Sequence, residues 1–185
     1  DAAANFPDYA NSKENIAKDM EKIKAAGFTD IIVDVRPTTG DVLFNTNVVD
    51  QVKRMDVWGN SGYSYYERTE TWDYLQAFIE EARIQGLKVN ASINTFVGGY
   101  LCPYNLGHDG VLFRDESKKG WASVANLADG LTNTMDLLDD ETDYGAKFFN
   151  PANDDVQNFV LQLLADLAKY DLDGIILDRC RYDDY

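Results

Sequence analysis

Apolar residues recur at helical spacing in three segments of the chain, and a short apolar or β-branched run follows each segment. The spacing predicts helices at residues 12–26, 72–85 and 154–170. The runs predict strands at residues 30–36, 87–94 and 174–178. Strands that alternate with helices pair in parallel through right-handed crossovers, so the pattern predicts an α/β fold.

Capping signals mark the ends of the predicted helices. Asn11 and Glu14 resemble a capping pair before the first helix, and Asn153 is placed to cap the third. Gly27 and Gly86 stand where the first two helices should end. These signals support the boundaries that the apolar spacing predicts.

The connections between elements are unequal in length. Helix-to-strand joints are only a few residues long, whereas residues 37–71 and 95–153 separate a strand from the next helix. The long connecting segments therefore follow the carboxyl ends of the strands. Both βα-barrels and open α/β sheets bind their ligands at that end.

The two faces of the predicted strands differ in polarity, because side chains alternate between the faces of a strand. Odd-numbered strand positions are apolar, namely Ile31, Val33, Val35, Val89, Ala91, Ile93, Ile175 and Leu177. Even-numbered positions become polar toward the carboxyl end, namely Asp34, Arg36, Asn90, Ser92, Asn94 and Asp178. A doubly wound sheet is covered on both faces and should be apolar on both, so the pattern favours a barrel.

The predicted architecture is therefore a segment of a (β/α)8 TIM barrel. Three parallel strands cannot close an eight-stranded barrel. We expect residues 1–185 to hold strands 2 to 4 with their helices and long βα loops, as part of a catalytic domain whose first strand and C-terminal half lie outside this chain.

Composition narrows the possible partners. The chain has 185 residues, 45% hydrophobic and 26% charged, which is typical of a globular domain. Its formal net charge of −15 disfavours nucleic acid and anionic membrane surfaces, and favours a neutral or cationic ligand. No apolar stretch approaches the roughly 20 residues of a membrane span. The oligomeric state cannot be inferred from the sequence.

Few residues are suited to bind metals or cofactors. The chain has one histidine, His108, and two cysteines, so it offers few ligands for a zinc site and a single histidine for a nucleophile–His pair. No glycine-rich phosphate loop follows a strand, which disfavours an oxidoreductase or a phosphate-binding enzyme. The acidic run at residues 136–143 lacks EF-hand spacing and is interpreted as a solvated loop rather than a calcium site. We therefore expect neither metal nor cofactor, and Cys102 and Cys180 are either free or paired.

Asp178 is the strongest candidate for chemistry. It ends an apolar strand on the even-numbered face and is followed by Arg179, Arg181 and Tyr182. A carboxylate kept ionised by cationic neighbours suits the nucleophile or general base of a glycosidase. The alternative is a structural aspartate that caps the next turn or pairs with Arg181.

Two further polar residues end predicted strands on the same face. Arg36 precedes Pro37, so the chain must leave the strand there. Arg36 either orients a carboxylate or binds a substrate hydroxyl, or it forms a structural ion pair with Asp34 or Asp178. Asn94 either binds sugar hydroxyls or satisfies loop backbone. Asp34, deeper in the strand, is interpreted as structural.

The long connections are rich in aromatic residues, among them Trp58, Tyr66 and Trp121. Rings with polar tips suit the mixed apolar and hydroxylated faces of a sugar. We predict these three residues, together with Arg181, as substrate contacts. The alternative is that the rings pack the loops against the barrel rim.

Several segments resemble the glycosyl hydrolase-like family 10 proteins, a group of bacterial βα-barrel proteins. The matching pieces are Val35-Arg36-Pro37 with Gly40–Phe44, the helix and strand over residues 74–94, Asn150-Pro151-Ala152, and Asp173–Asp178 followed by Arg181-Tyr182. The resemblance implies an eight-stranded barrel that acts on polysaccharide, with Asp178 at the catalytic position. It also implies a periplasmic, cell-surface or secreted location in a bacterium.

The predicted function is therefore a glycoside hydrolase that acts on a polysaccharide or oligosaccharide. Arg36 and Asn94 would position Asp178 and the sugar, and the second carboxylate would come from a strand outside this chain. The positions after Asp178 depart from the family pattern, since Arg179, Cys180 and Asp183 replace an acid, an aromatic residue and a proline. This departure motivates the alternative, a barrel that binds carbohydrate without hydrolysing it.

Overall fold

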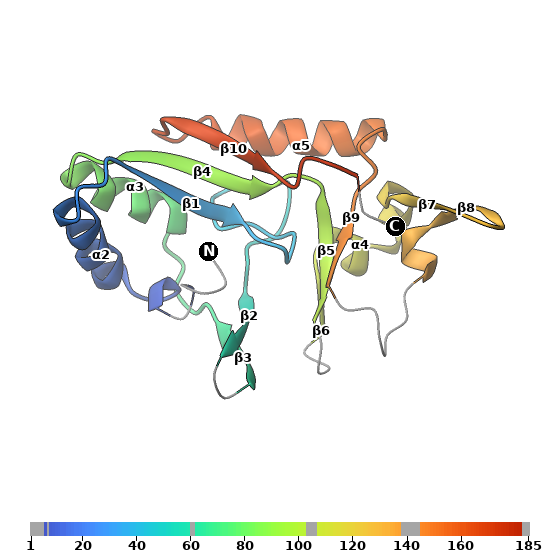
Figure 1. Ribbon diagram of the computed structural model, residues 1–185, viewed down its shortest axis with the longest axis horizontal. Coiled ribbons are helices and arrows are strands. Elements are labelled where there is room, and N and C mark those ends of the chain that lie inside the picture. Colours follow the sequence, from blue (N-terminus) through green and yellow to red (C-terminus); the bar gives the residue numbers. More distant parts are fainter. Residues whose placement is uncertain (1–5, 7, 60–61, 103–106, 138–144, 183–185) are drawn as a thin grey trace.

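The computed structural model describes residue 6 and residues 8–59, 62–102, 107–137 and 145–182 (Figure 1). Its central feature is a parallel sheet in the order β1–β4–β10, formed by Asp30–Arg36, Lys88–Asn94 and Gly174–Asp178. Three long helices precede these strands in turn, namely α2 (Lys13–Ala25), α3 (Tyr74–Ile84) and α5 (Asp154–Leu167). The predicted helices, strands and parallel pairing are confirmed.

The capping predictions are confirmed except at the start of the first helix. The Asn153 side chain accepts hydrogen bonds from the backbone of Asp155 and Val156 at the start of α5. Gly27 and Gly86 follow α2 and α3 with φ angles of +88° and +66°, a left-handed conformation that favours glycine.

At the first helix, the prediction that Asn11 caps it is wrong. Ser12 is the N-cap residue of α2 and accepts from the backbone N–H of Asn15. The Asn11 side chain instead accepts from the backbone N–H groups of Thr69 and Glu70, at 2.9 and 3.2 Å. A polar residue near a helix start can satisfy a distant loop as readily as the helix itself.

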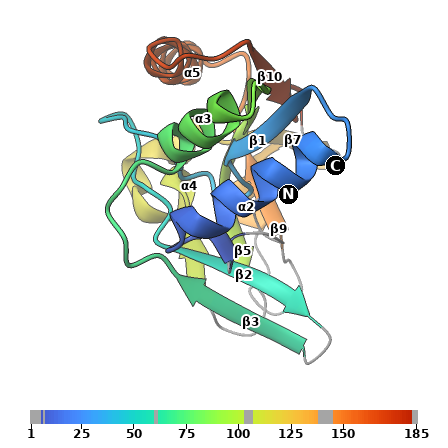
Figure 2. The same cartoon turned by 90° about the vertical axis from the view of Figure 1, so that its left-hand side faces the viewer.

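The long strand-to-helix connections form small antiparallel sheets of their own. The first connection, between β1 and α3, forms the hairpin β2 (Arg54–Gly59) and β3 (Gly62–Glu67), which extends away from the parallel sheet (Figure 2). The second connection, between β4 and α5, forms a sheet in the order β6–β5–β9, from Gly107–Asp109, Val97–Cys102 and Gly145–Phe148. It also contains α4 (Val111–Arg114), two 3₁₀ helices, η1 (Glu116–Trp121) and η2 (Thr134–Leu137), and the hairpin β7 (Val124–Leu127) and β8 (Gly130–Asn133).

The expectation of a (β/α)8 barrel segment is wrong: the structure is a small α/β domain with one three-stranded parallel sheet and several small antiparallel sheets. Val33 and Ala91 on one face of the parallel sheet are buried, whereas Ile32 on the other face is 63% exposed and Ile176 is 38% exposed. The polar alternate positions thus indicate a face that is partly open to solvent. They do not line the mouth of a closed barrel.

A register shift adds a second physical reason for that error. In β1, Asp34 pairs with Ser92, but Arg36 pairs with Ile93, so a β-bulge separates Asp34 from Arg36. A bulge inserts one residue and reverses which face the following side chains occupy. Arg36 therefore lies with the buried residues rather than with Asp34.

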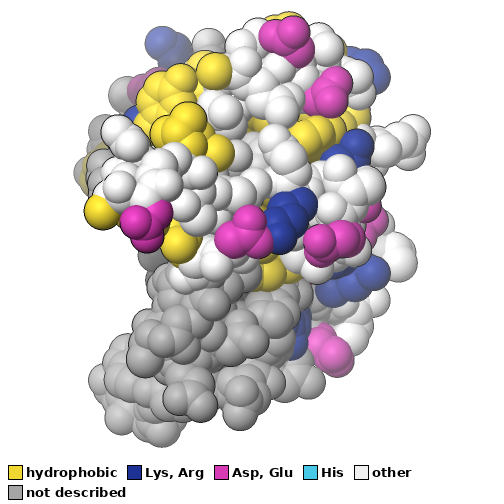
Figure 3. Space-filling view, turned by 90° about the vertical axis from the view of Figure 1, so that its right-hand side faces the viewer, with side chains coloured by type: hydrophobic (Ala, Val, Ile, Leu, Met, Phe, Trp, Pro, Cys, Tyr) yellow, Lys and Arg dark blue, Asp and Glu magenta, His cyan; other side chains and the backbone are white. Residues whose placement is uncertain are grey.

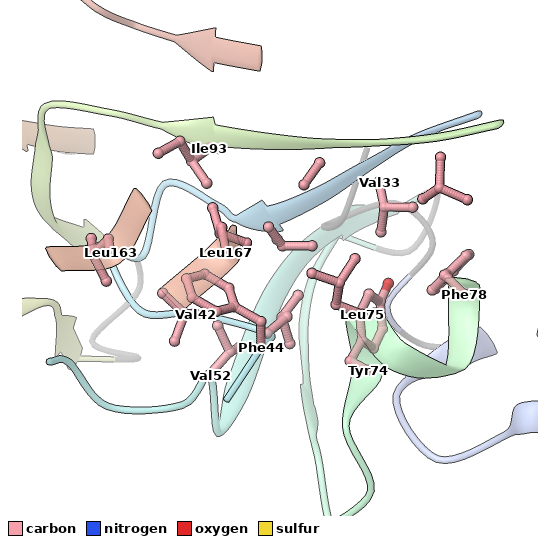
Figure 4. Close-up of a cluster of buried hydrophobic side chains, with 14 of the residues drawn as sticks. Val33, Val42, Phe44, Val52, Tyr74, Leu75, Phe78, Ile93, Leu163 and Leu167 are labelled. Carbon is pink, nitrogen blue, oxygen red and sulfur yellow. The ribbon is translucent and has the colours of Figure 1, made fainter. Parts of the chain in front are cut away.

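The main core lies between the parallel sheet and the elements that cover its buried face. Figure 4 shows side chains of β1 and β4, such as Val33 and Ile93, together with Leu75 of α3, Phe44 of the first connection and Leu163 of α5. Leu75, Phe44 and Leu163 are fully buried. The first long connection is therefore part of the core as well as a source of surface loops.

Apolar side chains also reach the surface on the β7–β8 hairpin, where Val124, Leu127 and Leu131 are 49%, 43% and 75% exposed. Figure 3 shows apolar side chains among acidic and basic ones on the side of the molecule from which this hairpin projects in Figure 1. Within the described part of the chain, no helix has the length and apolar character of a membrane span, as expected.

Two leucines on α5 test this description of the core. Leu163 is fully buried and Leu161 is 62% exposed. We expect Leu163→Ala to lower the free energy of unfolding by about 2 to 5 kcal/mol, because it leaves a cavity. Leu161→Ala should change it by less than about 0.5 kcal/mol. Urea unfolding of both variants measures the difference, and equal losses would contradict the assigned orientation of α5.

Candidate functional site

The carboxyl ends of β4 and β10 bring two predicted residues side by side. Asp178 is the register partner of Asn94, and the Asp178 carbonyl accepts from the backbone N–H of Thr95 at 2.8 Å. The Asp178 carboxylate is exposed and accepts from the backbone N–H of Arg179 at 2.7 Å. Asp178 is thus accessible to a ligand, and it also caps the turn that follows its strand.

Arg36 is fully buried and binds backbone oxygen atoms. Its guanidinium donates to the carbonyl of Asn94 and, at 2.6 Å, to the carbonyl of Val97. The Asn94 side chain returns a hydrogen bond to the Arg36 carbonyl at 3.0 Å. Arg36 and Asn94 are therefore brought together as predicted, but their contacts hold the turn between β4 and β5.

Two aromatic rings enclose the Arg36 guanidinium. Its central carbon lies 5.9 Å from the ring centre of Phe149 and 5.7 Å from that of Phe159. A cation over an aromatic face is attracted by the negative potential of the ring. Burial lowers the pKa of Arg36 to about 10, although the carboxylates of Asp41 and Asp34 oppose this shift. Arg36 remains protonated at neutral pH and positions the surrounding elements.

The same two rings support Trp121 at the end of η1. The Trp121 ring packs against Phe149 and Phe159 in edge-to-face geometry, at 5.9 and 5.6 Å between centres. The ammonium of Lys118 lies 4.2 Å from the centre of the Trp121 ring. Trp121 is thus half-buried, and its ring contacts both the core phenylalanines and the Lys118 ammonium.

Trp121 borders a groove of about 630 Å³, which is within the usual size of ligand pockets. The first connection, the α4–η1 segment and the amino-terminal half of α5 form its walls. We call this space the first hollow. Its lining residues are Asn47, Val48, Val49, Asp50, Val111, Arg114, Asp115, Lys118, Trp121, Asp155, Asn158, Phe159 and Gln162.

The strongest cation at the first hollow is already paired. Arg114 binds both carboxylate oxygens of the buried Asp41, one of them at 2.8 Å, and its Nε lies 3.4 Å from Asp50. Burial raises the pKa of Asp41, and the hydrogen bonds from Arg114 oppose this shift. Hydrogen bonding to Asp41 raises the pKa of Arg114. This ion pair joins α4 to the first connection and leaves Arg114 poorly suited to capture an anion.

One stripe of α5 supplies polar groups to the first hollow. Asp155, Asn158 and Gln162 are exposed and recur at the spacing of one helix face. Among the described residues, the side chains of Asn158 and Gln162 have no hydrogen-bond partner. This stripe was not predicted from the sequence. Its signal is a set of polar residues interleaved with the apolar positions of the same helix.

The other predicted contacts are dispersed. Tyr66 is exposed on β3, and Arg181 lies over the Phe148 ring with 5.6 Å between its guanidinium carbon and the ring centre. The side chain of Trp58 lies outside the described residues, as do those of His108 and Cys102. Cys180 is exposed and free. Among the predicted aromatic contacts that the structure describes, Trp121 lines a hollow.

The acidic run falls only partly within the described residues. Asp136 forms an ion pair with Lys119, and residues 138–144 are outside the described part. Across the described ranges, no group of three or more histidine, cysteine, aspartate or glutamate side chains is arranged to hold a metal ion.

Comparisons with known proteins give a relative and a structural neighbour. An S-layer-related protein from Niallia circulans is 30% identical in an alignment 192 residues long, gaps included. The alignment covers 99% of this chain, and the chain spans 11% of the length of that protein. A crystal structure of a hypothetical protein from Ruminiclostridium thermocellum ATCC 27405 aligns with a TM-score of 0.56 at 10% identity, covering 95% of this chain and 75% of that one. The structural likeness shows a shared fold. No family model matches the chain, so the resemblance to glycosyl hydrolase-like family 10 stays a prediction.

The role of Arg36 can be tested by a substitution that keeps its charge. Lysine has a single ammonium and cannot reproduce the forked contacts of Arg36 to Asn94 and Val97. We expect Arg36→Lys to lower the free energy of unfolding by about 2 to 4 kcal/mol, since buried carbonyl groups lose charged donors. The exposed Arg181→Lys is the control and should change it by less than about 0.5 kcal/mol. Chemical denaturation checks both, and a stable Arg36→Lys protein would show that the fork is dispensable.

Proposed function

We propose that this chain is a carbohydrate-binding domain of a cell-surface or secreted protein, and that a neutral glycan binds in the first hollow. The observation that carries the proposal is that Trp121, supported by the core, lines the same space as the amides of Asn158 and Gln162, which have no hydrogen-bond partner among the described residues. An indole ring provides an apolar surface with a polar edge, and each amide both donates and accepts hydrogen bonds. Sugar hydroxyls and ring faces require both kinds of contact.

The charges of the first hollow disfavour an anionic ligand. Its lining contains the carboxylates of Asp50, Asp115 and Asp155 and the cations Arg114 and Lys118. Arg114 is bound to Asp41 and Asp50, and Lys118 lies over Trp121. The formal net charge of the whole chain is −15. An anionic ligand would meet repulsion with little compensation from these cations.

The location is proposed from the relative. The name S-layer-related protein, given to the Niallia circulans protein, supports a cell-surface or secreted location for this chain. A glycan at or near the cell surface would then be the accessible ligand class.

Hydrolysis remains the second candidate function, because the Asp178 carboxylate is accessible at the end of β10 beside Asn94. Its neighbours Arg36 and Asn94 are engaged with each other and with the turn after β4. A glycosidase requires a second carboxyl group across the scissile bond. The binding proposal needs no such group, and it uses polar side chains that are shown to line a hollow.

The amides of α5 provide the test of binding. We expect the double variant Asn158→Ala/Gln162→Ala to weaken binding of a neutral oligosaccharide about tenfold or more, since each lost hydrogen bond contributes about 0.5 to 1.5 kcal/mol. Isothermal titration calorimetry with neutral oligosaccharides measures the affinity. Asn126→Ala, an exposed amide on β7 that does not line the first hollow, is the matched control. Equal affinity of the double variant and the control would refute the proposed site.

A substitution at Asp178 distinguishes the hydrolysis hypothesis from the binding hypothesis. If the chain only binds glycan, Asp178→Asn should leave oligosaccharide affinity within twofold, and the wild-type protein should release no reducing ends. Asp129→Asn, in the turn of the β7–β8 hairpin, is the control for loss of one exposed carboxylate. Reducing-end release that disappears in Asp178→Asn and persists in Asp129→Asn would establish the hydrolytic alternative instead.

A further inference from the structure

A second hollow of about 340 Å³ lies beside the carboxyl-terminal half of α5. Its lining residues are Asn45, Thr46, Asn47, Gln51, Asp166 and Lys169. Asn47 also lines the first hollow, so the two spaces border the same residue of the first connection. Both spaces therefore lie between that connection and successive turns of one helix.

The polar stripe of α5 continues from the first hollow into the second. Asp155, Asn158 and Gln162 line the first, and Asp166 lines the second. These positions are separated by three or four residues and share one helix face. The distance along the helix axis from Asp155 to Asp166 is about 16 Å, at about 1.5 Å per residue. The stripe is thus longer than a single sugar ring.

Hydrogen bonds fix the wall opposite this stripe. The Thr46 hydroxyl donates to the Asp166 carboxylate, and the backbone N–H of Asn45 donates to the Tyr170 hydroxyl at 2.7 Å. Tyr170 in turn donates to Asp73, the N-cap residue of α3. The first connection is therefore held against α5 before any ligand arrives, which reduces the ordering cost of binding.

The second hollow presents exposed polar groups and little net charge. Asn45 and Asn47 are exposed, and their side chains have no hydrogen-bond partner among the described residues. Lys169 forms an ion pair with Asp166 at 2.5 Å. Amides and a balanced ion pair match hydroxyl groups better than they match a net charge.

We infer that the glycan of the proposed function is a linear neutral oligosaccharide that lies along α5 and occupies both hollows. The inference rests on the proposed function and adds that the glycan is linear and several sugar units long. A short sugar fills the first hollow, beside Trp121 and the amides of Asn158 and Gln162. Additional units cross the Thr46–Asp166 contact and reach Asn45 and Lys169.

The test is the dependence of affinity on chain length. Calorimetry would use neutral linear oligosaccharides of two to six units from β-1,4-linked glucose, N-acetylglucosamine and mannose. In any series that binds, we expect the affinity to rise about tenfold or more between two and six units, as contacts in the second hollow are added. Equal affinity at all lengths would overturn the inference and leave the proposed function standing.

Variants at each hollow locate the added contacts. Asn45→Ala/Lys169→Ala should weaken the six-unit sugar about tenfold and leave the two-unit sugar unchanged, whereas Asn158→Ala/Gln162→Ala should weaken both. Asn126→Ala remains the control for both sugars. An unchanged six-unit affinity in the second-hollow variant would overturn the inference. Absence of binding to every series and length would overturn the proposed function and the inference together.

Discussion

The burial of the Arg36 guanidinium is the constraint on which the rest of this structure depends. A buried cation is costly unless hydrogen bonds replace its hydration. Here the carbonyls of Asn94 and Val97 accept from it, and two phenylalanine rings enclose it. These partners come from the end of β4, the start of β5, the segment after β9, and α5. One side chain thus ties the parallel sheet to the second long connection.

The rings that enclose Arg36 also support the candidate site. Phe149 and Phe159 pack against Trp121, which borders the first hollow. Phe159 and the amides of Asn158 and Gln162 belong to one helix, so α5 contributes both to the core and to the polar wall of the groove. The orientation of the groove is therefore set by core packing, and its surface chemistry is free to vary at exposed positions.

The local pattern of the sequence was sufficient to predict the three long helices and the parallel strands, because amphipathic spacing and caps such as Asn153 act within a few residues. The face assigned to Arg36 was wrong because a bulge after Asp34 reverses side-chain alternation, and alternation alone carries no signal of a bulge. The antiparallel sheets of the long connections depend on pairing between distant residues, such as Val97 with Phe148. Trp121 was predicted as a ligand contact, and the α5 amides were missed because exposed polar residues on a helix are common.

Electrostatic pairing is one reason for proposing that the groove takes a neutral, hydrogen-bonding ligand. The Arg114–Asp41 pair lies at the wall of the first hollow, and a bidentate contact of this kind is strong and directional. Its cation is therefore engaged by the protein, and Asp166 likewise engages Lys169 in the second hollow. The groups left for a ligand in the first hollow include the Trp121 ring and the amides of Asn158 and Gln162. Under the proposed function, recognition would depend on whether the spacing of hydroxyls along the ligand matches the fixed spacing of side chains on α5.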